Sequence, residues 1–170
     1  FMLLLPARSG LEAAAAIRQK YYTELGRVRN RLPIALGLVF AQAHTPLAAI
    51  LDAGRRMLKM PVEAESWPLA DDVQPCNGDG WMVEFQNSIR WCIPAKMGDG
   101  ETRDEWYAYF QRTEGGEPVH VKSLRRGEHV QVSPSRFDFE FLDSAARRFE
   151  LCYSPEACAR RSPRPYLLEQ

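Results

Sequence analysis

Residues 32–40, LPIALGLVF, and residues 41–60, AQAHTPLAAILDAGRRMLKM, decide how the first part of the chain is organised. The first stretch is apolar at almost every position, which is typical of a strand covered on both faces. In the second stretch Thr45 is an N-cap and Pro46 occupies the first helical position, and apolar residues recur at helical spacing as far as Leu58. We therefore predict a strand over 32–40 and a helix over 45–59.

A second apolar run, Phe1–Leu5, opens the chain and ends at Pro6. Ser9 and Glu12 then form a capping box, which predicts a helix over 9–25 ended by Gly26. The order strand, helix, strand, helix predicts an α/β segment over 1–60, with its two strands neighbouring in one sheet and both helices on one face. Because a bare apolar strand is an unusual start, we expect the sequence to be a piece of a longer protein.

The composition and the hydrophobic pattern of the sequence change after residue 60. Residues 61–80 are aperiodic and rich in Pro, Gly and Asp, which predicts a linker or long loop. Residues 81–170 hold short runs of alternating apolar and polar residues between turn signals, which predicts a separate antiparallel, β-rich domain. In its clearest strand we expect Phe137, Phe139 and Phe141 to turn inward and Asp138 and Glu140 to turn outward. The expected fold class is α+β.

Composition and charge exclude few function classes. The net charge of zero hides a basic segment, residues 1–60 at +6, and an acidic remainder, so either phosphate-bearing ligands or docking between the segments explains the split. No apolar stretch approaches the roughly 20 residues that span a bilayer. The four cysteines, Cys76, Cys92, Cys152 and Cys158, lack metal-site spacing. We expect free thiols in a cytoplasmic protein with no membrane partner.

The first sixty residues resemble the second half of a palm domain, a ferredoxin-like half, of the GGDEF-type cyclases and related polymerases. FMLLLPA looks like the strand that follows the metal-binding hairpin in that family. A more specific resemblance is to the palm-domain large subunit of type III CRISPR effector complexes, in its Csx-type variant. It is carried by GRVRNRLPIALGLVFAQAHTPLAAILDAGRRML, WMVEFQNSIRWCIPAKMGDGETRDEWYAYF, VHVKSLRRGEHVQVSPSRFDFEFLDSAARRFELCY and RPYLLEQ.

The resemblance implies that the intact parent binds ATP with Mg²⁺ and makes cyclic oligoadenylate when target RNA is bound. The carboxylates for that two-metal chemistry would lie before Phe1. Glu12, Glu24 and Asp52 stand on helices, where they do not replace them. We therefore expect no catalytic residue, no metal and no cofactor in this chain by itself.

Lys59 is the residue that the resemblance places nearest to nucleotide. In the family a Lys seven positions after an Asp contacts phosphate, and Asp52 and Lys59 have that spacing. A Lys in the last helical turn also complements the helix dipole without any ligand. Arg27, Arg29 and Arg31 are further candidates for nucleic-acid or phosphate contact, because arginine forks match phosphate oxygens. Their other interpretation is a solvated loop.

Three functions remain open at this stage. The chain is a part of a cyclic-oligoadenylate-making effector subunit, a non-catalytic assembly or RNA-contacting module of that complex, or a degenerate GGDEF-type signalling cyclase. The expected partners are other CRISPR effector subunits and, indirectly, guide and target RNA. The scattered histidines lack a nucleophile pattern, and aromatic residues on strands are more often core than base-stacking platforms.

Overall fold

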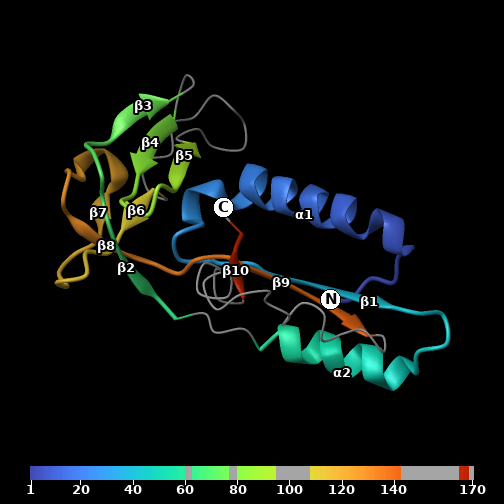
Figure 1. Cartoon of the computed structure of the whole chain (residues 1–170). Coiled ribbons are helices and arrows are strands. Elements are labelled where there is room, and N and C mark those ends of the chain that lie inside the picture. Colours follow the sequence, from blue (N-terminus) through green and yellow to red (C-terminus); the bar gives the residue numbers. More distant parts are fainter. Residues whose placement is uncertain (60–62, 77–79, 95–107, 143–164, 169–170) are drawn as a thin grey trace, which may run out of the picture. The chain divides into compact units, whose positions relative to one another are not determined.

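In the part of the chain that the structure describes, two α-helices are combined with several small sheets, and the fold is α+β (Figure 1). The computed structural model describes residues 1–59, 63–76, 80–94, 108–142 and 165–168. These residues divide into two compact units: unit 1 holds residues 1–19, 34–61 and 136–168, and unit 2 holds residues 20–33, 62–135 and 169–170.

Unit 1 is built on a three-stranded sheet in the order β1-β9-β10, formed by Ala35–Ala41, Arg136–Leu142 and Tyr166–Leu167. β1 and β9 are parallel, and β10 is antiparallel to β9. The predicted strand over 32–40 is confirmed with shifted ends. Its neighbour is β9 from the far end of the chain, so the expectation that residues 81–170 form a separate antiparallel sheet is wrong for this strand.

β9 alternates between two faces, but the predicted division into inward phenylalanines and outward acids is wrong, because Glu140 faces helix α2 (Leu47–Met57) and pairs with Arg56 at 3.1 Å. Because parallel neighbours in register share a face, Phe139 lies beside Leu38 and Phe141 beside Phe40, with the rings of Phe40 and Phe141 stacked 4.6 Å apart. Asp138 lies on the opposite face. The residues of β9 are half-buried rather than fully covered.

Helix α2, Leu47–Met57, packs against β1 and β9, and helix α1, Gly10–Leu25, begins at the same sheet. A Cβ built on Gly37 would lie 2.8 Å from Met57 Cβ, so α2 covers the face of β1 that carries Gly37. A Cβ built on Gly10 would lie 3.5 Å from the Phe40 ring, on the opposite face. The predicted placement of both helices on one face is therefore wrong, although both helices form close to their predicted ranges.

Phe1–Leu5 do not form a strand. Their side chains are exposed, with Phe1 at 95% and Leu4 at 89%. The prediction that they neighbour residues 32–40 in one sheet is wrong. The physical reason is that an extended apolar segment becomes a strand only when a neighbouring strand takes up its backbone hydrogen bonds. The 3₁₀ turn η1, Ala7–Ser9, follows them and leads into α1.

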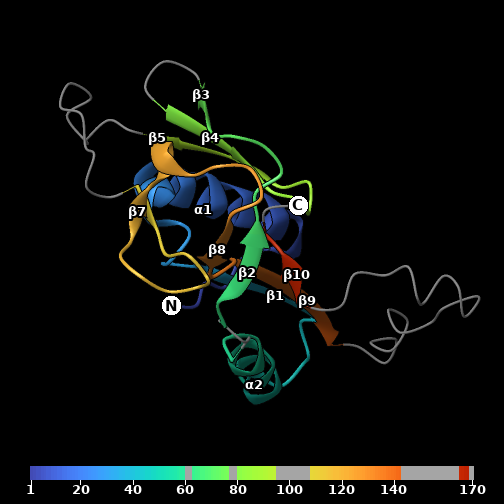
Figure 2. The same ribbon diagram turned by 90° about the vertical axis from the view of Figure 1, so that its left-hand side faces the viewer.

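The described part of unit 2 consists of small antiparallel sheets (Figure 2). Its strands are β2 (Glu65–Pro68), β3 (Gln74–Cys76), β4 (Gly80–Glu84), β5 (Arg90–Pro94), β6 (Tyr109–Phe110), β7 (Val119–His120) and β8 (His129–Val132), with 3₁₀ turns η2 (Gly26–Val28) and η3 (Val121–Ser123). The sheets are β2-β8, β3-β4-β5 and β6-β7. Trp67, Phe85 and Trp91 pack edge-on or tilted at 5.1–5.6 Å and form the centre of the core.

A disulfide joins Cys76 of β3 to Cys92 of β5. The expectation of free thiols is therefore wrong for these two residues. Nothing in their spacing of 16 positions indicates the bond, because the pairing depends on where β4 places its two neighbours. Cys152 and Cys158 lie outside the described residues.

Candidate nucleic-acid interface

A group of cations in unit 2 lies on residues 121–128, which we call the basic loop, and hydrogen bonds to Asp72 and Glu128 hold its backbone. Val121 and Leu124 anchor it, since both side chains are completely buried. The backbone N–H of Val121 donates to the carbonyl of Ala108 at 2.7 Å, and that of Leu124 donates to Val121 at 3.1 Å. The exposed residues of the loop are thus held on two fixed apolar anchors.

The loop reverses at Gly127, whose φ of +81° is a backbone conformation that residues with a side chain rarely adopt. The N–H of Glu128 donates to the carbonyl of Arg125 at 3.1 Å, and the N–H of Gly127 donates to Leu69 at 3.0 Å. The turn leads directly into β8.

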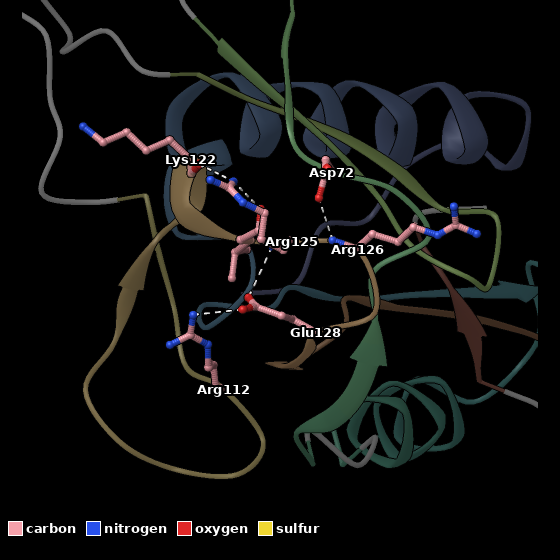
Figure 3. A network of polar contacts seen from close by, with 7 residues as sticks. Asp72, Arg112, Lys122, Arg125, Arg126 and Glu128 are labelled. Atoms are coloured by element: carbon pink, nitrogen blue, oxygen red, sulfur yellow. Dashed lines mark hydrogen bonds and ion pairs between the residues drawn. The ribbon is translucent and has the colours of Figure 1, made fainter.

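Two carboxylates fix the backbone of the basic loop (Figure 3). Glu128 Oε1 accepts from the guanidinium of Arg112 at 3.0 Å, and its Oε2 accepts from the backbone N–H of Arg125 at 3.3 Å. Asp72 Oδ1 accepts from the backbone N–H of Arg126 at 2.9 Å. Both acids therefore bind the main chain of the loop, and neither carboxylate neutralises the side chain of Arg126.

The cations of the loop differ in what they contact. The guanidinium of Arg125 donates to the carbonyls of Lys122 and Leu124 at 3.3 and 3.2 Å, which closes the turn from outside. Arg126 is exposed, and its guanidinium makes no hydrogen bond or ion pair with the residues that the structure describes. Figure 3 shows the side chains of Lys122 and Arg126 extending away from the loop. An exposed guanidinium on a fixed backbone is suited to grip a phosphate oxygen pair.

Arg29, one of the three predicted phosphate contacts, has a packing role. It is 8% exposed, and its guanidinium carbon lies 4.3 Å from the ring centre of Tyr22 and 4.2 Å from that of Trp91. A cation held between two aromatic faces is stabilised by their π-electrons and cannot also reach a polymer in solvent. Arg27 is half-buried in η2, and Arg31 is exposed just after it.

Lys59 follows the end of α2 in unit 1, where its backbone N–H donates to the carbonyl of Arg56 at 3.1 Å. Its side chain is exposed. Asp52, seven positions earlier, is also exposed and pairs with Arg55 at 3.5 Å. The structure is thus compatible with the phosphate contact and with the dipole interaction alike.

The carboxylates considered for metal binding are not gathered. Glu24 pairs with Lys20 at 2.7 Å, and the hydrogen bond and charge of Lys20 lower the pKa of this fully exposed carboxyl. Within the described ranges, no group of three His, Cys, Asp or Glu residues is arranged to hold a metal ion. Two of the three histidines make local hydrogen-bond contacts: His120 Nδ1 accepts from the N–H of Lys122, and His129 Nδ1 lies 3.2 Å from Ser66 Oγ.

Sequence reasoning missed the basic loop as a site. The signal was present in KSLRRGEH, residues 122–129, where three cations surround a turn. What the sequence did not show is that Asp72, far along the chain, would fix the backbone and leave the guanidinium of Arg126 unpaired among the described residues.

Comparison with protein-family models, with curated proteins and with solved structures found no match. Among the described residues, neither helix has the length and apolar character needed to cross a bilayer.

Proposed function

We propose that the chain is a non-catalytic, RNA-contacting module of the palm-domain large subunit of a type III CRISPR effector complex. The family part of the proposal rests on the sequence strings quoted above, which extend over both units. The RNA part rests on one observation, the exposed guanidinium of Arg126 on a backbone fixed by Asp72.

The physical argument concerns conformational entropy. A flexible basic loop loses backbone freedom when it binds, at about 1–2 kcal/mol per residue that becomes ordered. The basic loop is already held by Asp72, Glu128 and the buried Leu124, so most of that cost is absent on binding. Arg126 can then interact with a phosphate, which is the part of RNA recognition that carries no sequence information.

The enzymatic part of the family resemblance is a weaker candidate. Phe1–Leu5 form no strand beside β1, and α1 and α2 contact opposite faces of β1, whereas the palm arrangement expects a paired strand and helices on one face. ATP and Mg²⁺ therefore belong in the proposal only to the intact subunit, with Lys59 as a phosphate contact there. A signalling cyclase has no observation in its favour beyond the shared palm resemblance.

The experiment is direct binding of a fluorescently labelled single-stranded RNA of about 20 nucleotides to the full chain, followed by ultraviolet cross-linking and peptide mapping. The proposal predicts salt-sensitive binding, with cross-links on peptides that contain residues 121–128. Cross-links confined to other peptides, or no binding at low salt, would refute an RNA contact at the basic loop.

A further inference from the structure

The Cys76–Cys92 disulfide connects strands that do not pair with each other. In the sheet β3-β4-β5, Cys76 lies opposite Gly80 of β4, and Cys92 lies opposite Met82 of β4. The two cysteines have Cα atoms 6.2 Å apart, so the bond crosses over the central strand. It fixes the edge strand β3 to β5, in addition to the short ladder between β3 and β4.

Gly80 leaves the space through which the bond passes. A Cβ built at this position would lie 2.9 Å from Cys76 Sγ and 3.1 Å from Cys92 Sγ. Separations under 3.0 Å are essentially never found for a real Cβ, so even alanine would displace the sulfur atoms. Glycine at residue 80 is therefore required by the positions of the two sulfur atoms.

The two ends of the bridge differ in access to solvent. Cys92 is exposed, whereas Cys76 is 8% exposed. Thiol–disulfide exchange requires a thiolate to approach one sulfur atom in line with the bond, and the exposed sulfur is the one that it can reach. Attack at Cys92 makes the buried Cys76 the leaving thiolate.

The segment that leads into β3 also contains Asp72, the carboxylate that holds the backbone of the basic loop. Asp72, which accepts from the backbone N–H of Arg126, stands four positions before Cys76 on the segment that leads into β3. With the bridge open, the segment that carries Asp72 is kept in place after Asp72 by the three residue pairs of β3 with β4. Before Asp72 it is held by the backbone N–H of Ala70, which donates to the carbonyl of Glu84 at 2.8 Å. The position of Asp72, and hence the order of Arg126, depends in part on the bridge.

We propose that a dithiol reversibly opens the Cys76–Cys92 disulfide, and that opening it releases Asp72 from the basic loop. We call this reversible disulfide the staple. In the step, a dithiol thiolate attacks Cys92 Sγ, the bond to Cys76 Sγ breaks, and Cys76 leaves as a thiolate and takes up a proton. The second thiol of the reductant then displaces Cys92, so two electrons and two protons pass from the dithiol, which becomes a cyclic disulfide. An oxidised dithiol carrier reverses the reaction. Any effect on RNA affinity rests additionally on the function proposed above.

The test uses the full chain, oxidised and after equilibration with dithiothreitol, beside the Cys92→Ser variant treated in the same way. Peptide mapping after alkylation must find Cys76 and Cys92 linked without reductant, and both labelled together after reduction. Hydrogen exchange must then become at least about tenfold faster at the amide of Arg126 and in residues 74–76 of the reduced chain. Cys92→Ser must show the fast exchange already, with no further change in dithiothreitol.

Two results would overturn the staple: alkylation of both cysteines in the absence of reductant, or unchanged exchange at Arg126 and β3 in a fully reduced chain. The variant Gly80→Ala gives a second measurement, because its Cβ must hinder closure of the bridge and raise the alkylated fraction in oxidising buffer. None of these readouts involves RNA. Failure of RNA binding with a working staple would therefore refute the proposed function alone.

Discussion

Asp72 Oδ1 accepts a hydrogen bond from the backbone N–H of Arg126 at 2.9 Å, across 54 positions of sequence. The contact joins the segment before β3 to the turn before β8. It holds the main chain and leaves the guanidinium of Arg126 to solvent (Figure 3). The carboxylate of Asp72 thus fixes the backbone of the basic loop, while the positive charge of Arg126 remains exposed to solvent.

Replacing Asp72 should loosen the loop without unfolding unit 2. We expect Asp72→Ala to lower the free energy of unfolding by about 1 kcal/mol or less, since the contact is exposed to water. Hydrogen exchange at the Arg126 amide should become faster. Asp72→Asn keeps an acceptor oxygen and should change less. The matched control is Asp71→Ala, because Asp71 only accepts from the neighbouring N–H of Asp72. Equal exchange in all three variants would contradict the role of Asp72.

Arg29 should matter for stability rather than for ligand binding. Arg29→Ala removes a nearly buried guanidinium from between Tyr22 and Trp91, and we expect a loss of about 2–3 kcal/mol in the free energy of unfolding. Arg29→Lys should recover only part of it, because an ammonium does not stack as a plane. Urea unfolding followed by tryptophan fluorescence measures both. A loss below about 0.5 kcal/mol for alanine would show that the stacked cation contributes little.

Two glycines of unit 1 should respond in opposite ways to alanine. At Gly37 the new Cβ would meet the Cβ and Sδ of Met57 at 2.8 Å, so Gly37→Ala should push α2 from β1 and cost about 1–3 kcal/mol. At Gly54, inside α2, the nearest atom is the flexible end of Met2 at 3.4 Å. Gly54→Ala should therefore be neutral or stabilise by up to about 1 kcal/mol. Thermal unfolding compares them, and destabilisation by both would contradict the packing described.

The phosphate contact of Lys59 belongs to the proposed palm-domain subunit, so its test uses the intact subunit that the proposal assumes. If the exposed ammonium of Lys59 contacts phosphate, Lys59→Ala should weaken ATP binding by about 1–2 kcal/mol, the effect of losing a charge-assisted hydrogen bond. Folding should hardly change, because the residue lies at an exposed helix end. Arg55→Ala on the same helix serves as the control for loss of a positive charge. Equal ATP affinity of the Lys59 variant and the parent would leave only the interaction with the helix dipole.

Local pattern was enough to find α1, α2 and most of β1. Helical spacing, the Pro46 start and the apolar run of 32–40 are all properties of neighbouring residues, so no knowledge of the rest of the chain was needed. The same is true of the alternation in β9, which placed Phe139 and Asp138 on opposite faces correctly.

Local patterns could not predict contacts between residues that are distant in sequence. The alternation of β9 does not say which strand it joins, and its actual neighbour lies about a hundred residues earlier. Phe1–Leu5 have the composition of a buried strand but no strand beside them. Arg29 was read as a solvated or phosphate-binding cation, since nothing near it in sequence indicated that Trp91 would cover it. The Cys76–Cys92 bond was not predicted for the same reason, because no local pattern indicates which cysteines become neighbours.

The most direct test of the account is the RNA affinity of three Arg126 variants, measured by fluorescence anisotropy on the same single-stranded RNA. Arg126→Lys keeps the charge and should bind within about threefold of the parent chain, whereas Arg126→Ala should lose about three- to tenfold and Arg126→Glu more. The slope of the logarithm of the binding constant against the logarithm of the salt concentration should become shallower by about 0.7 in Arg126→Ala, as expected for one lost phosphate contact. Arg90→Ala, which removes an exposed cation paired with Glu84, should leave both values unchanged. If Arg126→Glu binds RNA as tightly as the parent chain and with the same salt slope, the basic loop is not an RNA-contacting surface.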